Sequence, residues 1–190
     1  LHLSRGLGDV YKRQGKQKIP FTTGILIGIG ETRLDRLESL YEISKLHKQY
    51  NHIQEVIVQN FKPKPNTLMA NSPEPSFDEL IWTIAMARLI LPGDISVQVP
   101  PNLNVEHIKK LTVSGINDFG GISPVTKDYV NPEAPWPEIE KLGKLALHSN
   151  QSLVARTTLY PKYFANLNEF SSPSIASKLL NITDARSLIR

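Results

Sequence analysis

The sequence contains no cysteine. Disulfide bonds, cysteine nucleophiles and thiolate-bound metals are therefore excluded for these 190 residues. No apolar run is long enough to cross a membrane, and the hydrophobic content of 40% is sufficient for a packed core. We therefore expect a cytoplasmic protein, or part of one, with no membrane contact and no metal ligands within the chain.

An excess of charge of one sign is also missing from most of the chain. The net charge is +4, and residues 1–18 account for all of it, because the rest of the chain holds 17 basic and 17 acidic side chains. The basic residues of the first segment are Arg5, Lys12, Arg13, Lys16 and Lys18, against Asp9 alone. The balanced charge of the remainder gives no indication of a nucleic-acid partner.

Residues 1–18 show neither sustained periodicity nor the apolar region of a signal peptide. We interpret LHLSRGLGDVYKRQ as a non-native lead-in, similar to translated adaptor sequence, and expect the chain to start within a domain. Residues 19–165 form the patterned domain. Residues 166–190 are predicted to be a partly helical tail, with a helix from about Ser174.

Four predicted strands alternate with predicted helices. The stretch IPFTTGILIGIGE (19–31) contains an apolar run broken by glycines, which is typical of a buried parallel strand. The further strands are expected at 53–60, at 94–100 and, very short, from Ile116, with another short strand at 152–160. Capping signals predict helices from Thr32 to about Gln49, over 77–91, over 105–114 capped by Asn104, and from Pro137 to about His148. This alternation predicts an α/β fold with a parallel sheet and right-handed crossovers.

The carboxyl ends of the predicted strands carry the unusual residues. In a parallel barrel, the loops at this end form the active site. The residues concerned are Gly28, Gly30, Glu31, Gln59, Asn60, Asn102, Asn104, Asn117 and Asp118.

The sequence does not match a complete dinucleotide-binding or metal-binding motif, and the role of one aspartate has two interpretations. Gly28 and Gly30 begin a dinucleotide fingerprint, but Arg33 stands where its third glycine would be. His47 and His52 are poorly spaced for a metal pair, and we expect them to be solvated surface residues. Asp118 is a candidate general acid or base, or a ligand for a polar substrate, and the alternative is an aspartate that caps its own loop.

A family resemblance rests on two sets of residues. Gly24, Gly28 and Glu31 match the GxIxGxxE pattern of radical S-adenosylmethionine enzymes, with Leu26 in place of the isoleucine. Across residues 19–165, the segments VQNFKPKPNT, VQVPPNLN and GINDFGGISPVTKDYVNPEAPWP resemble the deazaflavin-forming 7,8-didemethyl-8-hydroxy-5-deazariboflavin (FO) synthase family. The continuation ISPVT…NPEAPWP distinguishes this family from related menaquinone-pathway and tyrosine-transferring enzymes.

The resemblance implies a TIM-type (βα) barrel, S-adenosylmethionine and a 4Fe-4S cluster held through CxxxCxxC. It also implies a reaction in which a 5′-deoxyadenosyl radical acts on a tyrosine-derived adduct of 5-amino-6-(D-ribitylamino)uracil, with ring closure and loss of ammonia, in coenzyme F420 biosynthesis. The cysteine motif is absent here. We therefore expect a partial barrel without its N-terminal strands, inactive on its own. The alternatives are the partner tyrosine–uracil transferase and a menaquinone-pathway enzyme.

The resemblance also assigns expected roles to single residues. Asp118 is the expected catalytic residue, and the apolar run 25–27 is expected to form walls around the radical. The expected partner is the tyrosine–uracil transferase, as a subunit or fused domain. The expected cofactor-binding residues are Gly24, Leu26, Gly28, Glu31 and Gln59, and the expected substrate-binding residues are Asn102, Asn117, Gly120, Gly121 and Ser123.

Overall fold

The computed structural model describes residues 5–190. Its centre is a parallel sheet with the order β1 (Phe21–Ile27), β2 (Ile53–Asn60) and β3 (Ser96–Gln98). The predicted α/β class and the first three strands are therefore confirmed. The fourth predicted strand is reduced to a single parallel bridge between Asp118 and Gln98.

The strand predicted at 152–160 is wrong, since this segment is irregular. Its backbone does not join the strand ladder: the Gln54 side chain of β2 donates to the carbonyl of Thr158 at 3.0 Å, and the amide of Ile189 donates to the carbonyl of Ala155 at 3.0 Å. These partners satisfy two of the carbonyl groups that a strand ladder would otherwise use.

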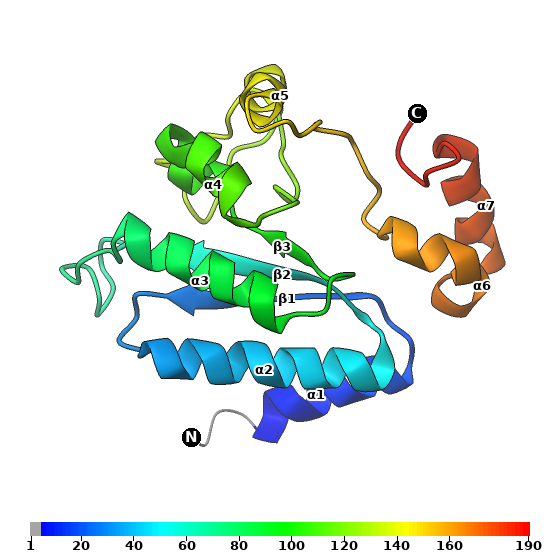
Figure 1. The fold of residues 1–190 in the computed structure, drawn as a ribbon, viewed down its shortest axis with the longest axis horizontal. Helices are drawn as coiled ribbons and strands as arrows, with labels where there is room; N and C mark the ends of the chain where they lie inside the picture. Colours follow the sequence, from blue (N-terminus) through cyan, green and yellow to red (C-terminus); the bar gives the residue numbers. More distant parts are fainter. Residues whose placement is uncertain (1–4) are drawn as a thin grey trace.

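Two helices cover one face of the sheet (Figure 1). They are α2 (Arg33–Tyr50) and α3 (Phe77–Ile90), close to their predicted bounds. At the start of α2, Thr32 and Asp35 form both bonds of the predicted capping box, and at the start of α3 the Ser76 side chain accepts a bond from the Glu79 amide. The main core lies between these helices and the sheet and includes Ile27, Leu40, Val56, Val58, Ile84 and Val97.

The chain after β3 differs from the prediction at one helix start. Residues 101–107 form the 3₁₀ helix η1 (Pro101–His107), which is followed by α4 (Ile108–Ser114) and α5 (Ile139–Leu147). The predicted capping role of Asn104 is wrong, because α4 begins only at Ile108 without a side-chain cap bond, and the Asn104 Nδ2 donates to Asn60 Oδ1 at 2.8 Å. A capping side chain accepts from the amides of a helix start, whereas the Asn104 amide group acts here as a donor to Asn60.

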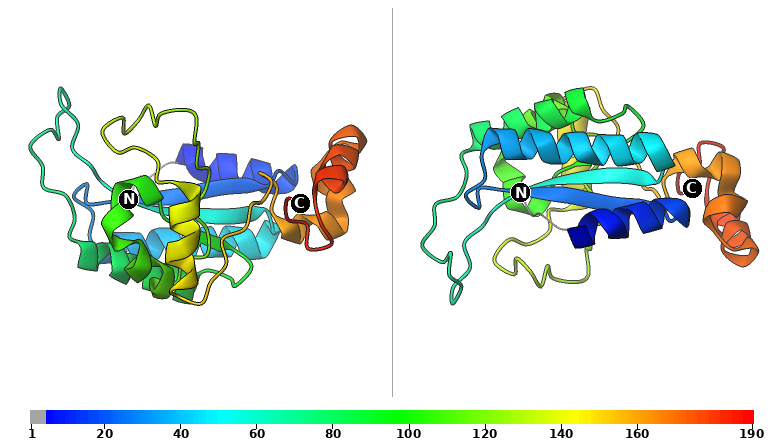
Figure 2. Two further views of the ribbon diagram at one scale, coloured as in Figure 1. Left: turned by 90° about the horizontal axis from the view of Figure 1, so that it is seen from above. Right: turned by 90° about the horizontal axis from the view of Figure 1, so that it is seen from below.

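The two ends of the chain add helices around the sheet. A helix that the sequence analysis did not predict, α1 (Arg5–Lys16), lies along β1, where Tyr11 contacts Phe21 and lies 2.7 Å from Thr23 Oγ1 (Figure 2). The tail holds η2 (Pro161–Asn166), α6 (Leu167–Phe170) and α7 (Pro173–Ile182), so the helix expected near Ser174 is confirmed. The domain limits at 18/19 and 165/166 stay predictions.

The prediction of solvated histidines is wrong. His47 and His52 are buried, His52 completely. His47 Nε2 lies 2.9 Å from Asp94 Oδ2, and its Nδ1 accepts from the amide of Ile53 at 3.2 Å. Both rings are buried where α2 ends and β2 begins, which their spacing in the sequence did not reveal. Within residues 5–190, no helix is both long and apolar enough to cross a bilayer.

Candidate functional site

The face of the sheet opposite α2 and α3, here called the open face, carries most of the expected cofactor residues. Paired residues of neighbouring parallel strands point to the same side, and the pairs Gly24–Ile57 and Leu26–Gln59 belong to this face. A Cβ atom at Gly24 would lie 2.5 Å from the Ile57 carbonyl oxygen, so β2 requires glycine there. Leu26 is 41% exposed. The structure therefore brings Gly24, Leu26 and Gln59 together.

The expected apolar wall is only partly present. Ile27 is fully buried in the core beneath α2 and α3, and Ile25 packs against that core. Because successive side chains of a strand point to opposite faces, only Leu26 of this run can face a ligand on the open face.

Glu31 organises the turn at the carboxyl end of β1. Its carboxylate accepts from the amides of Gly28 and Ile29, each at 2.8 Å, and from Arg36 Nε at 2.8 Å. Burial would raise the pKa of Glu31, but these hydrogen bonds outweigh it and lower the pKa. Gly28 has a φ of 90°, and a Cβ there would lie 2.6 Å from Pro75. Glu31 thus holds the turn in shape rather than presenting a free carboxylate.

A cluster of four polar side chains lies on the open face. Arg156 donates to both oxygens of Asp118, at 2.6 and 2.9 Å, and to Glu55 Oε1 at 3.3 Å. The Tyr160 hydroxyl lies 2.6 Å from Glu55 Oε1 and 2.9 Å from Asp118 Oδ2. Two carboxylates therefore share one guanidinium group and one phenol.

Burial shapes the electrostatics of this cluster. It raises the pKa of Glu55, and the nearby Asp118 carboxylate adds to the rise, against the hydrogen bond from Tyr160. It also raises the pKa of Tyr160, with Asp118 as the second cause. Each of the two groups therefore keeps its proton to a higher pH than the same side chain does in water.

Asp118 is surrounded by donors. Besides Arg156 and Tyr160, the amide of Gly120 donates to Asp118 Oδ1 at 2.6 Å, as the loop-capping alternative requires. Gly120 has a φ of 70°, and a Cβ there would collide with the side-chain amide of Gln98. Asp118 and Gly120 therefore lie together beside Gln98, in a loop whose shape depends on both.

Three expected substrate residues lie elsewhere. Asn117 Oδ1 accepts from the amide of Val97 at 2.8 Å and from Arg88 of α3 at 2.9 Å. Ser123 Oγ accepts from the amide of Thr126 at 2.9 Å and stabilises its own turn. Gly121 is exposed, and a Cβ there would meet no atom within 4 Å. The structure does not bring these three to the Asp118 cluster, and their roles stay predictions.

Asn102 lines a cavity of about 660 Å³ at the carboxyl ends of β2 and β3. Its Nδ2 donates to Asp128 Oδ2 at 2.8 Å and to the carbonyl of Ala134 at 3.1 Å. Asn60 and Asn104 line the same cavity. Because this is the end of the sheet where ligands bind in parallel α/β proteins, the cavity is part of the candidate site.

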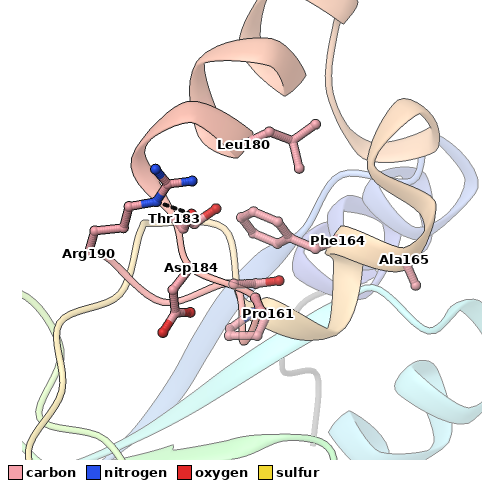
Figure 3. A pocket seen from close by; sticks show the side chains of 9 residues that line it. Pro161, Phe164, Ala165, Leu180, Thr183, Asp184 and Arg190 are labelled. Carbon is pink, nitrogen blue, oxygen red and sulfur yellow. Dashed lines mark hydrogen bonds between the residues drawn. The ribbon is translucent and has the colours of Figure 1, made fainter.

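A second hollow of about 600 Å³ lies at the other end of the molecule, between η2 and the residues after α7. Figure 3 shows Phe164 and Leu180 on its walls and the bond from Arg190 Nε to the Thr183 carbonyl, 2.8 Å long. Asp184 is bound by Arg186 at 2.9 Å. The polar groups of this hollow bond to one another, so it is not the candidate site. Among residues 5–190, no three His, Asp or Glu side chains are placed to hold a metal ion.

Comparison with known proteins gives a consistent result. The chain is 56% identical over 154 residues to the 7,8-didemethyl-8-hydroxy-5-deazariboflavin synthase of Methanopyrus kandleri, covering 81% of this chain and 46% of the relative. It is 52% identical over 157 residues to the synthase of Methanococcus maripaludis strain C5, covering 83% and 44%. The chain is homologous to the FO synthases. No protein-family model matches it.

The length of the match differs between FO synthases. The chain spans less than half of the two archaeal relatives. It is 48% identical over 171 residues to the FO synthase of Nocardia farcinica, covering 90% of this chain but only 20% of that longer protein. The homologous region is therefore one part of a larger synthase in each case.

Sequence reasoning missed Glu55, Arg156 and Tyr160. A signal existed for Glu55, because a carboxylate in the apolar strand IQEVIVQN must find a partner when buried. Arg156 and Tyr160 gave no signal, since their segment has no regular structure and reaches the sheet only through tertiary folding.

Proposed function

We propose that this chain is the carboxyl-terminal part of the barrel of an FO synthase. The complete enzyme then converts the tyrosine-derived adduct of 5-amino-6-(D-ribitylamino)uracil into the deazaflavin chromophore of coenzyme F420, with loss of ammonia. The observation that carries this proposal is the identity of about half of the residues with FO synthases over four fifths of the chain. The turn held by Glu31 and the glycines around it supports the proposal.

A partial TIM-type barrel accounts for the arrangement of the sheet. The strands are parallel and consecutive in the sheet, and one face is fully covered by helices. In a closed barrel the open face is the interior, and β1 is the edge strand of the described sheet, where a preceding strand would pair in place of the contact with α1. The Asp118 cluster would then lie inside the barrel.

The residues at the end of β1 fit the adenine of S-adenosylmethionine. Leu26 is 41% and Ile29 45% exposed, and together with Gly28 they offer an apolar surface that a flat ring can contact closely. When bound, S-adenosylmethionine supplies the 5′-deoxyadenosyl group that starts the reaction. A 4Fe-4S cluster does not fit this chain, because no cysteine is present to bind it. Its ligands would come from the rest of the enzyme.

Within this proposal, Asp118 orients the substrate. Its carboxylate already accepts from Arg156, Tyr160 and the Gly120 amide, so it acts by holding the loop at Gly120 in place against the substrate and not by accepting a further donor. The partner is the tyrosine–uracil transferase, as a separate subunit or a fused domain. The much greater length of the Nocardia farcinica FO synthase supports the fused form in some relatives.

A chimera tests the proposal. The part of the Methanopyrus kandleri synthase that precedes the homologous region is joined to residues 19–190 of this chain and supplied with reductant, S-adenosylmethionine and the adduct. We expect a fluorescent deazaflavin from the chimera and none from the chain alone. A chimera that binds its cluster but forms no deazaflavin would contradict the proposal, and one that consumes free tyrosine would favour the transferase.

A further inference from the structure

The cavity beside Asn102 has a polar wall that the Asp118 cluster does not use. It lies between the first turn of α3, η1 and the segment around Ala134, at the carboxyl ends of β2 and β3. Its volume of about 660 Å³ is typical of small-molecule sites. Its walls include Asn60, Lys62, Glu74, Phe77, Asn102 and Ala134.

Asn102 carries a polar atom without a partner. The side chain is only 5% exposed, and its Nδ2 bonds to Asp128 and Ala134 fix the orientation of the amide. Its Oδ1 is buried and accepts no hydrogen bond from any described residue. An unsatisfied buried acceptor costs about 1–3 kcal/mol, and a small shift of the Asn102 side chain toward an N–H or O–H donor in the cavity would remove this cost.

Charges around the cavity restrict the ligand further. Three carboxylates line it, those of Glu74, Glu106 and Glu133, against one lysine, Lys62. Lys62 pairs with Glu74, and Lys64 of the same loop pairs with Glu133. The lysine charges are thus already balanced, and a phosphate or other anion would be repelled. The charges therefore disfavour an anionic ligand, and a neutral ligand is compatible with them.

The lining also offers donors and acceptors close together. The Lys62 ammonium can donate, whereas the Glu74 carboxylate and Asn102 Oδ1 can accept. Phe77, stacked on His107 with ring centroids 4.1 Å apart, adds an apolar wall. A hydroxyl group can both donate and accept, so a chain of hydroxyls on a carbon backbone matches this mixture better than a purely apolar group.

We propose that this cavity binds a neutral polyhydroxylated chain, and that in the enzyme this chain is the ribityl group of the substrate. The proposal rests on the proposed function for the identity of the substrate, but the polyol preference follows from the cavity alone. The ribityl chain anchors the uracil ring at the carboxyl end of the sheet, near the turn that Glu31 holds. Pro75 connects the two places, since it lines the cavity and packs against Gly28.

Calorimetry on the 190-residue chain tests the proposal with two probes, 6-(D-ribitylamino)uracil and 6-(methylamino)uracil. We expect the ribityl probe to bind about tenfold more tightly or better, which corresponds to about 1.4 kcal/mol or more. Ala134→Phe fills the cavity and keeps the carbonyl that Asn102 binds, and Lys62→Met removes a donor. Both variants should reduce the affinity of the ribityl probe to that of the methyl probe.

Lys144→Met is the matched control, because Lys144 forms an exposed ion pair with Glu140 on α5. It should leave both affinities unchanged. Equal binding of the two probes to the unaltered chain, or full ribityl preference in both cavity variants, would overturn the proposal. If the chimera makes deazaflavin while the probes bind equally, only the cavity proposal fails. Ribityl preference with an inactive chimera leaves the cavity proposal standing and refutes the proposed function.

Discussion

The polar side chains in the middle of the open face have hydrogen-bond partners, whereas one side-chain oxygen at the carboxyl end of the sheet has none among the described residues. On the open face, Glu55, Asp118, Arg156 and Tyr160 bond to one another. At the carboxyl end, the Asn102 oxygen has no described partner, and Leu26 and Ile29 are exposed. Satisfied buried polar groups stabilise and specify a fold, whereas unsatisfied ones favour a ligand. This difference supports our proposal that the cluster stabilises the site and that ligands bind at the strand ends.

Removing the Arg156 guanidinium group should cause the largest loss of stability. Arg156→Met leaves two carboxylates without their counter-charge, and breaking such a buried pair costs about 3 kcal/mol or more. For a chain of this size we expect the Tm to fall by about 10 °C. Thermal unfolding followed by circular dichroism measures it. Arg186→Met, which removes an exposed ion pair with Asp184, is the control. Equal shifts in the two variants would show that the cluster does not stabilise the fold.

A glycine pair tests how tightly the cluster's loop is fixed. Gly120→Ala places a Cβ against Gln98 at a positive φ, whereas Gly121→Ala meets open space. We expect a loss of about 2 kcal/mol for the first and less than about 0.5 kcal/mol for the second. Chemical denaturation measures both. A tolerated Gly120→Ala would mean that the loop moves freely and does not position Asp118.

The substitution Asp118→Asn in the chimera tests whether the cluster also contributes to catalysis. We expect turnover of the adduct to fall about tenfold or more, equivalent to roughly 1.4 kcal/mol in the barrier. Binding of S-adenosylmethionine should change little, because its proposed surface is on β1. Steady-state kinetics and a binding titration measure the two effects. Normal turnover with a lower Tm would show that Asp118 only caps its own loop and has no role in catalysis.

Acid should destabilise the amino end of the sheet, where two neutral histidines are buried. Burial, followed by the neighbouring His47, lowers the pKa of His52 to about 4, and burial, followed by Lys162, lowers that of His47 against the pull of Asp94. An unfolded histidine binds its proton near pH 6.5. Stability is therefore complete above about pH 6.5 and falls as the pH drops toward 4.

His52→Phe should make this fall in Tm shallower by several degrees. The substitution separates His52 from Glu55, whose raised pKa acts in the opposite direction. Thermal melts at pH 7 and pH 4.5 measure the difference. An unchanged pH profile in the variant would mean that the pKa of His52 is the same in the folded and the unfolded protein.

Local signals in the sequence predicted the helices well and the site only in part. The capping residues Thr32 and Ser76 and the apolar runs of β1 and β2 encode their elements within a few residues. The 3₁₀ helix η1 was not predicted, and Asn104 within it bonds to Asn60, which is distant in the sequence. A local capping preference cannot predict such a long-range contact.

The same distinction applies to the site. Gly24, Gly28 and Glu31 form a contiguous motif, and the structure keeps them at one strand and its turn. The Asp118 cluster instead depends on Arg156 and Tyr160, which approach from an irregular segment about forty residues later. Asn117, predicted beside Asp118, points to Arg88, because adjacent residues of extended chain face opposite sides.

Amide chemical shifts of the ¹⁵N-labelled chain, titrated with 6-(D-ribitylamino)uracil, test the difference between the two regions most directly. The account predicts the largest changes at the carboxyl end, at Gly28, Asn60 and Ala134, with the hollow beside Phe164 and Asp184 unaffected. Changes centred on Phe164 and Asp184, or spread evenly over the chain, would contradict it.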